Sequence, residues 1–280
     1  HITNNSPNAS IILGNSPPTT PSTLLRITGR PAGATHYYIN NSSAPAIINP
    51  NVDWQAGGGA AYNIVFGGSG DWIVRSSLRN SAGSGGTSLV KEGPGTMTWT
   101  NGTQHTASDP LNAVTLNAGN LFLQSSGLFP SQGGANPITI NAGSLVFDAD
   151  AQSDTIARAI GGASPGVLEI RAGTLTLSSG ASTFSGTINL TGGELIAGGT
   201  ETAGISGPLG QSGTISFTGG TLGYSANNAF DHCARFSTAA GQAYSIDTGG
   251  QNVTMATGLS SSGGTLTKNG SGTLTLSSTS

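Results

Sequence analysis

The stretch Val114-Thr115-Leu116-Asn117-Ala118-Gly119-Asn120-Leu121-Phe122-Leu123 decides the fold. Each half of it alternates apolar and polar residues, which is the period-2 pattern of a strand with one buried face. Gly119 lies between the halves, where a glycine supplies a positive φ at little steric cost. The connection is too short to hold a helix, so the stretch predicts a strand, a corner and a second strand.

The same unit recurs along the chain, at residues 138–147, 168–177, 188–197 and 215–224. The predicted corner glycines are Gly119, Gly143, Gly173, Gly193 and Gly220, separated by 24, 30, 20 and 27 residues. A fixed unit with variable spacing of this size predicts one coil of a β-solenoid per repeat. In a solenoid every copy meets the same surroundings, so one leucine of each copy is expected to stack in an internal column: Leu121, Leu145, Leu175, Leu195 and Leu222.

A sandwich of antiparallel hairpins is the competing interpretation, because it also has short strands and frequent turns. It does not explain why one unit recurs, since each sandwich strand has its own surroundings. We therefore predict an all-β chain in which residues 1–280 form a single parallel β-helix (β-solenoid) domain. Prolines interrupt residues 1–80, so we expect this segment to form either irregular N-terminal coils of the solenoid or a separate cap. Short strands are expected there at 24–28, 36–40, 46–49, 62–66 and 72–75.

A second motif occurs twice. Leu89-Val90-Lys91-Glu92-Gly93-Pro94-Gly95-Thr96-Met97-Thr98-Trp99 matches Leu266-Thr267-Lys268-Asn269-Gly270-Ser271-Gly272-Thr273-Leu274-Thr275-Leu276. Lys91 and Lys268 are the only lysines of the chain, and both hold the same position in the motif. Such a coincidence indicates that the two segments are copies of one structural element.

The shared pattern, L-x-K-x-G-x-G-T-φ-x-φ with φ apolar, resembles the autotransporter-associated β-strand repeat, also called the passenger-associated transport repeat. The resemblance is strong over 88–101 and 166–280, fair over 111–148 and weak before residue 80. It implies a right-handed parallel β-helix that a bacterium exports and displays on, or releases from, its surface. Members of the family often carry a C-terminal outer-membrane barrel, for which this sequence has no counterpart. The resemblance is therefore to a passenger piece, or to a relative with another export route.

Composition narrows the list of partners. Charged residues make up only 8 % of the chain, glycine contributes 45 residues, and the formal net charge is −3. The 9 basic residues are scattered among 12 acidic ones, whereas phosphate binding needs clustered Lys and Arg. No apolar run approaches the roughly 18 residues of a membrane-spanning helix. We expect no nucleic-acid partner and no membrane span in this chain.

Two motifs suggest chemistry but have simpler explanations. Asp148, Asp150 and Asp154 are spaced like part of a calcium loop, without its turn glycine and terminal glutamate. We expect solvated acids on a corner loop. The segment Gly162–Gly166 fits the G-x-S-x-G pattern of serine hydrolases, which needs a helix after the serine, whereas a strand is predicted here. We expect a turn.

Three further features also have a simple explanation. Gly67–Asp71 resembles a calcium-binding nonapeptide but is one residue short and does not repeat, so we expect a turn. His232-Cys233 is the one reactive-looking pair, and His1, His36 and His105 lack ligand spacing, so we expect a structural thiol in a loop. The tryptophans fit either a carbohydrate-stacking platform or the interior of the coil: Trp54, Trp72 and Trp99.

The sequence thus predicts no catalytic, cofactor-binding or metal-binding residue, no cofactor and no enzymatic activity. We expect an extracellular or cell-surface bacterial protein with a structural or adhesive role. Regular strand sequence at 272–278 and an apolar segment at 9–13 favour head-to-tail self-association into a filament. A cell-surface carbohydrate or protein is the other partner class. The alternative function is a polysaccharide-active β-helix enzyme, a lyase or a glycosidase, which would need clustered carboxylates on one face.

Overall fold

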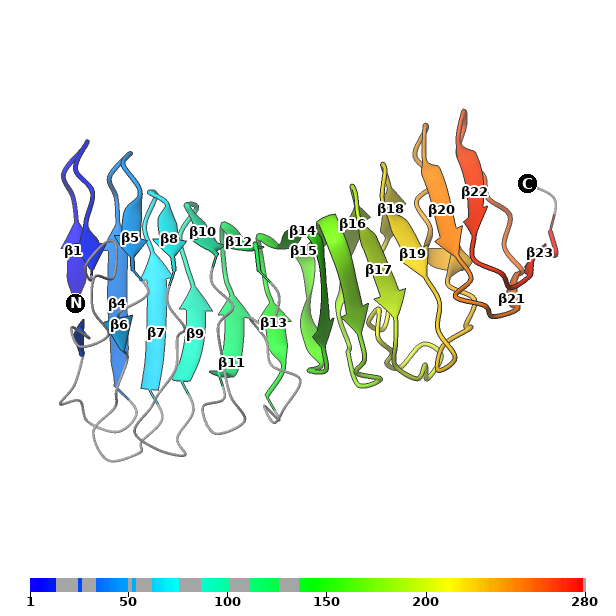
Figure 1. Cartoon of the computed structure of the whole chain (residues 1–280), viewed down its shortest axis with the longest axis horizontal. Coiled ribbons are helices and arrows are strands. Elements are labelled where there is room, and N and C mark those ends of the chain that lie inside the picture. The colour runs from blue at the N-terminus through cyan, green and yellow to red at the C-terminus, as the bar shows by residue number, and fades with distance from the viewer. Residues whose placement is uncertain are drawn as a thin grey trace. The chain divides into compact units, whose positions relative to one another are not determined.

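The computed structural model describes residues 1–13, 25–26, 34–49, 52–53, 62–75, 87–100, 111–125 and 136–278. The chain is an all-β parallel β-solenoid, as predicted, and not an antiparallel sandwich (Figure 1). It divides into two compact units, His1–Leu145 and Val146–Ser280, and each is described by itself. The right-handed sense of the coil stays a prediction.

The first unit contains short strands that match the expected segments. Its strands are β1 (Ile2–Asn4), β2 (Ile12–Leu13), β3 (Leu25–Arg26), β4 (Thr35–Asn40), β5 (Ala46–Ile48), β6 (Val52–Asp53), β7 (Tyr62–Gly67), β8 (Trp72–Val74), β9 (Thr87–Lys91), β10 (Thr96–Trp99), β11 (Leu111–Leu116), β12 (Asn120–Leu123), β13 (Ile138–Ile140) and the start of β14 (Ser144–Ile156). One parallel ladder runs through β1, β4, β7, β9, β11 and β13, and a second runs through β2, β5, β8, β10 and β12.

The register of these ladders places side chains of successive coils in columns. The first ladder aligns Ile2, Tyr38, Phe66, Lys91, Leu116 and Ile140. The second ladder aligns Leu13, Ile48, Val74, Trp99 and Leu123. Because strands β4, β5, β7 and β8 share the register of β9 and β10, the segment before residue 80 repeats the coil geometry of the residues after it.

The second unit repeats the same design. After β14 come β15 (Ile160–Leu177), β16 (Ser185–Leu190), β17 (Glu194–Ala197), β18 (Ile215–Phe217), β19 (Thr221–Gly223), the 3₁₀ helix η2 (Cys233–Arg235), β20 (Ala243–Asp247), β21 (Val253–Met255), β22 (Thr265–Asn269) and β23 (Leu274–Leu276). One ladder runs through β15, β17, β19, β20 and β22, and others join β15, β16 and β18, and β21 to β23.

The corner glycines are required for two reasons. The φ angles of Gly119, Gly143, Gly173 and Gly193 are 68°, 80°, 79° and 59°, a region that residues with a Cβ rarely adopt. A Cβ on Gly143 would also collide with the carbonyl oxygen of Gly119 in the preceding coil. Gly220 lies at its expected corner between β18 and β19, but its φ is not positive, which corrects the prediction for this copy. The positive φ falls on the adjacent Gly219.

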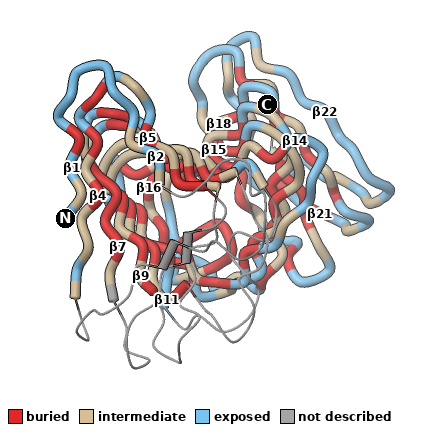
Figure 2. Tube along the Cα trace, turned by 60° about the vertical axis from the view of Figure 1, so that its left-hand side comes forward, coloured by how far each residue is buried: buried red, intermediate tan, exposed pale blue. Residues whose placement is uncertain are grey.

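The predicted internal leucines are confirmed. All five are no more than 1 % exposed: Leu121, Leu145, Leu175, Leu195 and Leu222. Within the second unit, Leu175, Leu195 and Leu222 are register partners in successive coils. The trace in Figure 2 shows the resulting alternation of buried and less buried residues along the strands. Burial of this kind is the main stabilising contribution available to such a fold.

Candidate functional site

Lys91 occupies an interior position in a column of large apolar side chains. It is 1 % exposed, between Phe66 and Leu116 in the ladder register. Its Nζ donates to three carbonyl oxygens, those of Glu92 (2.9 Å), Gly93 (2.9 Å) and Ala118 (3.3 Å). Burial lowers the pKa of Lys91 to about 8, against the opposite effect of nearby carboxylates. The ammonium group thus joins one corner to the corner of the following coil.

Arg235 makes a similar connection in the second unit. Its guanidinium donates to four backbone carbonyls of an earlier loop, those of Gly213 (3.0 Å), Gly210 (3.3 Å), Leu209 (2.9 Å) and Ser212 (2.7 Å). Burial lowers the pKa of Arg235, and the charge of Glu201 opposes that shift. A planar group with five donors suits this clustered set of acceptors. The side chain fixes the loop that ends at Gly213 against the 3₁₀ helix η2.

Residues next to η2 connect this loop to the next coil of the chain. The carboxylate of Asp231 accepts from the backbone N–H groups of Cys233 (2.9 Å) and Ala256 (2.8 Å). Burial raises the pKa of Asp231, but these hydrogen bonds outweigh it and the pKa lies below its usual range. The Cys233 thiol donates to the Thr257 carbonyl at 3.4 Å and accepts from the Thr257 N–H at 3.3 Å.

Cys233 lies in the 3₁₀ helix η2 and not in the expected loop, and its thiol is hydrogen-bonded to the chain itself. The thiol is buried, and burial raises its pKa, which disfavours the reactive thiolate. His232 is 1 % exposed and its ring lies near Tyr224 (6.1 Å between centroids) and Phe230 (5.2 Å). Burial lowers the pKa of His232 to about 3, so the imidazole is neutral at ordinary pH. The pair is part of the packing between coils.

The three aspartates do not form a metal site. Asp148, Asp150 and Asp154 all lie on β14, and Asp150 has a positive φ of 43°. In the described ranges, no group of three or more His, Cys, Asp or Glu side chains is arranged to hold a metal ion. The expectation of a corner loop was wrong, because these residues continue a strand. Asp150 is exposed, as expected, while Asp148 and Asp154 are partly covered.

The two glycine-rich motifs differ in outcome. Gly162–Gly166 lies inside the continuous strand β15, so the predicted turn was wrong, and no helix comes after Ser164 as a hydrolase nucleophile would need. The ladder between β15 and β16 shifts register between Ala163 and Val167, which accommodates the irregular sequence. Gly67–Asp71 is the expected turn: β7 ends at Gly67, Gly68 has φ 99°, and β8 begins at Trp72.

The described tryptophans lie inside the coil. Trp72 is 1 % and Trp99 0 % exposed, and the Trp72 indole donates to the Gly67 carbonyl at 3.1 Å. These two side chains therefore provide no stacking platform for a sugar. Trp54 and His105 lie outside the described residues. His1 stacks on Tyr37 with 4.7 Å between ring centroids, and His36 belongs to no metal-ligand set among the described residues.

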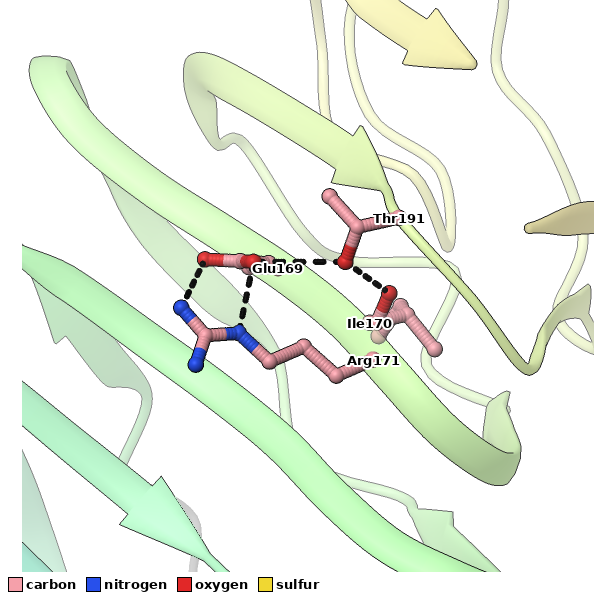
Figure 3. A network of polar contacts seen from close by, with 4 residues as sticks. All are labelled: Glu169, Ile170, Arg171 and Thr191. Atoms are coloured by element: carbon pink, nitrogen blue, oxygen red, sulfur yellow. Dashed lines mark hydrogen bonds and ion pairs between the residues drawn. The ribbon is translucent and has the colours of Figure 1, made fainter. Parts of the chain in front are cut away.

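An ion pair lies on the outer face of β15 (Figure 3). Arg171 donates to Glu169 through Nε (2.7 Å) and Nη2 (3.3 Å), and this hydrogen bond raises the pKa of Arg171. Thr191, from the next coil, places its hydroxyl 3.2 Å from Glu169 Oε1 and 3.0 Å from the Ile170 carbonyl. The arginine is 43 % exposed, and exposed pairs contribute at most about 1 kcal/mol. The carboxylate is engaged in surface packing.

Two carboxylates that the sequence did not single out approach each other on the outer face of the second unit. Glu194 lies on β17 and leans over Gly223 of β19, where a Cβ would lie 2.6 Å from Glu194 Oε1. The register places Asp247 of β20 beside Gly223. Burial raises the pKa of Glu194, and the charge of Asp247 raises it further. Gly223 has no side chain, so it leaves room for the Glu194 carboxyl group to lie over it, on the side of Asp247. This glycine between two strand acids is the sequence signal that could have pointed to the pair.

The coil formed by β22 and β23 is exposed. All residues of β22 are exposed, with Leu266 at 39 %, and Leu276 of β23 is 41 % exposed. A recess of about 180 Å³ lies here, and its apolar lining comes from Tyr244, Leu259, Leu266 and Leu276. Lys268 donates to the carbonyls of Asn269 (3.4 Å) and Gly270 (2.8 Å), the counterparts of the first two acceptors that Lys91 uses in its own motif.

Comparisons with known proteins add no family to this fold. No protein-family model matches the chain, and neither a curated protein nor a solved structure matches it. Within the part of the chain that is described, no helix has the length and apolar character needed to cross a bilayer. The established result is a parallel β-solenoid.

Proposed function

We propose that this protein is a non-enzymatic structural or adhesive β-solenoid of the bacterial cell surface. The observation that carries the proposal is the use of its charged side chains. Lys91 and Arg235 donate to backbone carbonyls of neighbouring coils and loops, and Asp231 accepts from backbone N–H groups. Groups that an enzyme would direct at a substrate are here directed at the chain itself, which favours stability over chemistry.

The likeness to autotransporter-associated repeats supports an exported location and a right-handed coil. The likeness rests on the motif at Leu89–Trp99 and Leu266–Leu276. The lysine of each copy donates to the carbonyls of the two residues that follow it in its own corner. Antibody labelling of intact cells of the source organism, compared with permeabilised cells, tests the location. Labelling that appears only after permeabilisation would contradict it.

Self-association end to end is the partner we favour, with a cell-surface carbohydrate or protein as the target of an adhesive role. The outer face of the second unit supports the adhesive role, because uncharged hydroxyl groups lie next to one another there. The Thr221 and Ser245 hydroxyls are 2.9 Å apart on successive coils. Binding of the purified chain to glycan arrays and to intact cells tests this role, and absence of binding to both leaves a purely structural function.

The second candidate is glycoside-bond cleavage, favoured only by the Glu194–Asp247 pair. A carboxyl group with a raised pKa beside a carboxylate is the arrangement that glycosidases use. Release of reducing ends from soluble polysaccharides separates the two functions. The structural proposal expects no release above the level of a Glu194→Gln control. Release that this substitution abolishes would establish the enzyme instead.

A further inference from the structure

His232 is a buried imidazole that makes no hydrogen bond. The side chain is 1 % exposed, and neither ring nitrogen has a hydrogen-bond partner among the described residues. Its neighbours are the aromatic rings of Tyr224 and Phe230. A neutral imidazole carries one N–H donor, which is costly to leave unpaired inside a protein, and a protonated one carries two. The position therefore accommodates the neutral ring and offers nothing to stabilise the protonated one.

The charges around His232 do not compensate for its burial. Arg235, on η2, repels a protonated imidazole, whereas the carboxylate of Asp231 attracts one but already accepts two backbone N–H groups. The segment stacked next, Val253–Thr257, holds no titratable side chain. Burial raises the pKa values of the thiol and the phenol beside the ring, so both are uncharged, and a carboxylate of the preceding coil acts on Arg235: Cys233, Tyr224 and Glu201.

The segment that carries His232, Ser225–Arg235, lies between β19 and β20 and belongs to no strand ladder of the described unit. Its backbone hydrogen bonds are internal, such as that from the Arg235 N–H to the His232 carbonyl at 2.9 Å. Its contacts with neighbouring coils are made by side chains, among them Asn228 to the Gly199 carbonyl (3.0 Å), Arg235 to the Leu209 carbonyl (2.9 Å), Asp231 to the Ala256 N–H (2.8 Å) and Cys233 to the Thr257 carbonyl (3.4 Å). Such a segment can open while the ladders on either side of it remain paired.

We propose that Ser225–Arg235 is an acid-sensitive latch, which detaches from the neighbouring coils when His232 takes up a proton while β19 and β20 stay paired. In the open segment the imidazole lies in water, where a proton on it meets no penalty from burial. In the closed segment the proton would lie among aromatic rings and near Arg235. Because only the open form binds the proton readily, acid shifts the equilibrium toward that form.

The size of the shift follows from the two pKa values of the ring. His232 should titrate near its ordinary value of 6.5 in the open segment, and in the closed segment its pKa is about 3. The ratio of open to closed segments should therefore increase about 25-fold between pH 7 and pH 5. Glu201 acts in the opposite direction, because burial raises its pKa and acid removes a charge that the closed form disfavours. A chain with Glu201→Gln removes this opposing effect.

The thiol of Cys233 reports the opening, because it is the only cysteine of the chain and is buried in the closed segment. The probe is dithiodipyridine, a disulfide that reacts with thiols at acid pH and releases a coloured thiopyridone. Its rate with the folded chain is divided by its rate with the urea-unfolded chain at the same pH, which removes the titration of the thiol itself. This ratio should increase about 25-fold from pH 7 to pH 5, with an unchanged far-ultraviolet circular dichroism spectrum.

Two variants assign the opening to the segment and to the histidine. His232→Phe keeps a ring that cannot be protonated, so its labelling ratio should stay constant between pH 7 and pH 5. In a chain with Ile170→Cys and Cys233→Ser, the thiol lies in the ladder of β15 and β16 and should be labelled at least about tenfold more slowly at pH 5. Labelling of Cys233 in the unmodified chain should also be nearly independent of low urea concentrations, because a local opening exposes little surface.

Three results would overturn the latch. A labelling ratio of the unmodified chain that stays constant from pH 7 to pH 5 would show that acid does not open the segment. Equal labelling of Cys233 and of the thiol at position 170, with the same steep dependence on urea, would mean that the whole unit unfolds. An undiminished increase in His232→Phe would assign the opening to another group.

Discussion

The segments Leu89–Trp99 and Leu266–Leu276 share a sequence motif and a backbone geometry but differ in burial. Leu89 and Trp99 are 0 % exposed, whereas their counterparts Leu266 and Leu276 are 39 % and 41 % exposed. Since the corner glycines and the lysine contacts within the motif are alike, the motif alone determines the local turn. Burial is supplied by the coil stacked on top.

This difference gives a rule for the whole fold. A coil of a solenoid cannot bury its apolar face alone, and each neighbour adds one side of the core. An interior residue and its counterpart in the exposed coil therefore form a natural pair for measuring the contribution of stacking to stability.

The largest expected effect is at the leucine column. Leu195→Ala should lower the free energy of unfolding by about 2–5 kcal/mol, because Leu195 is fully buried between Leu175 and Leu222. Leu266→Ala should cost less than about 1 kcal/mol, since the side chain already contacts water. Urea unfolding of both variants measures the difference. Equal losses would mean that the β22 coil is as tightly packed as the interior.

The next effect concerns the lysines. Lys91→Ala should cost about 2–3 kcal/mol, because the lost aliphatic stem and three unpaired carbonyls outweigh the relief of burying a charge. Lys268→Ala should change stability by less than about 0.5 kcal/mol, as exposed substitutions usually do. Both variants remove the same side chain from the same motif position. The ratio of their urea midpoints therefore measures how much the coil stacked on Lys91 contributes to stability.

The fold could be predicted because its information is local and repeated. Alternation in Val114–Leu123 set the inward residues, and Gly119 set the corner, so copying the unit gave the register of Leu175, Leu195 and Leu222. Where a copy departs from the pattern, the prediction failed. Gly162–Gly166 contains the turn residues glycine and proline, yet it lies inside β15, where Ala163 pairs with Ser185 of β16 before the register shifts.

The polar contacts could not be predicted to the same extent. The number of residues per coil varies, so the sequence does not show which residues of neighbouring coils lie side by side. It therefore does not show which carbonyls Arg235 contacts, or that Asp247 lies near Glu194. The burial of Lys91, in contrast, could have been predicted from the sequence. Lys91 follows the inward-facing Leu89 by two residues in an alternating strand, so it has to face inward as well. Its partners still depend on Ala118 in the following coil.

Acid should weaken the second unit through His232. Burial lowers its pKa to about 3 from an ordinary value of 6.5; nearby Arg235 adds to the shift, while Asp231 opposes it. As the pH falls below 6.5, His232 binds a proton in the unfolded chain but stays neutral in the folded chain. The free energy of unfolding should therefore fall by about 2 kcal/mol at pH 5. The variant His232→Phe replaces the imidazole with another ring near Tyr224 and Phe230. Its free energy of unfolding should not show this decrease between pH 7 and pH 5. An equal slope in the variant would assign the effect to other groups.

Alkaline pH should have a smaller effect of opposite direction on the first unit, through Lys91. Burial lowers the pKa of this lysine to about 8 from 10.5. Between these values the folded chain has released a proton that the unfolded chain still holds, so unfolding takes up a proton and stability increases with pH. The gain should reach about 1 kcal/mol at pH 9 relative to pH 7.

Urea unfolding at pH 7, 8 and 9 measures that gain, and the chain carrying Lys91→Ala serves as the reference that removes all other titrations. The difference between the two proteins should change across this range. A constant difference would mean that water reaches the Lys91 ammonium despite the coil above it. The covering coil would then supply packing to Leu89 and Trp99 but would not desolvate the lysine.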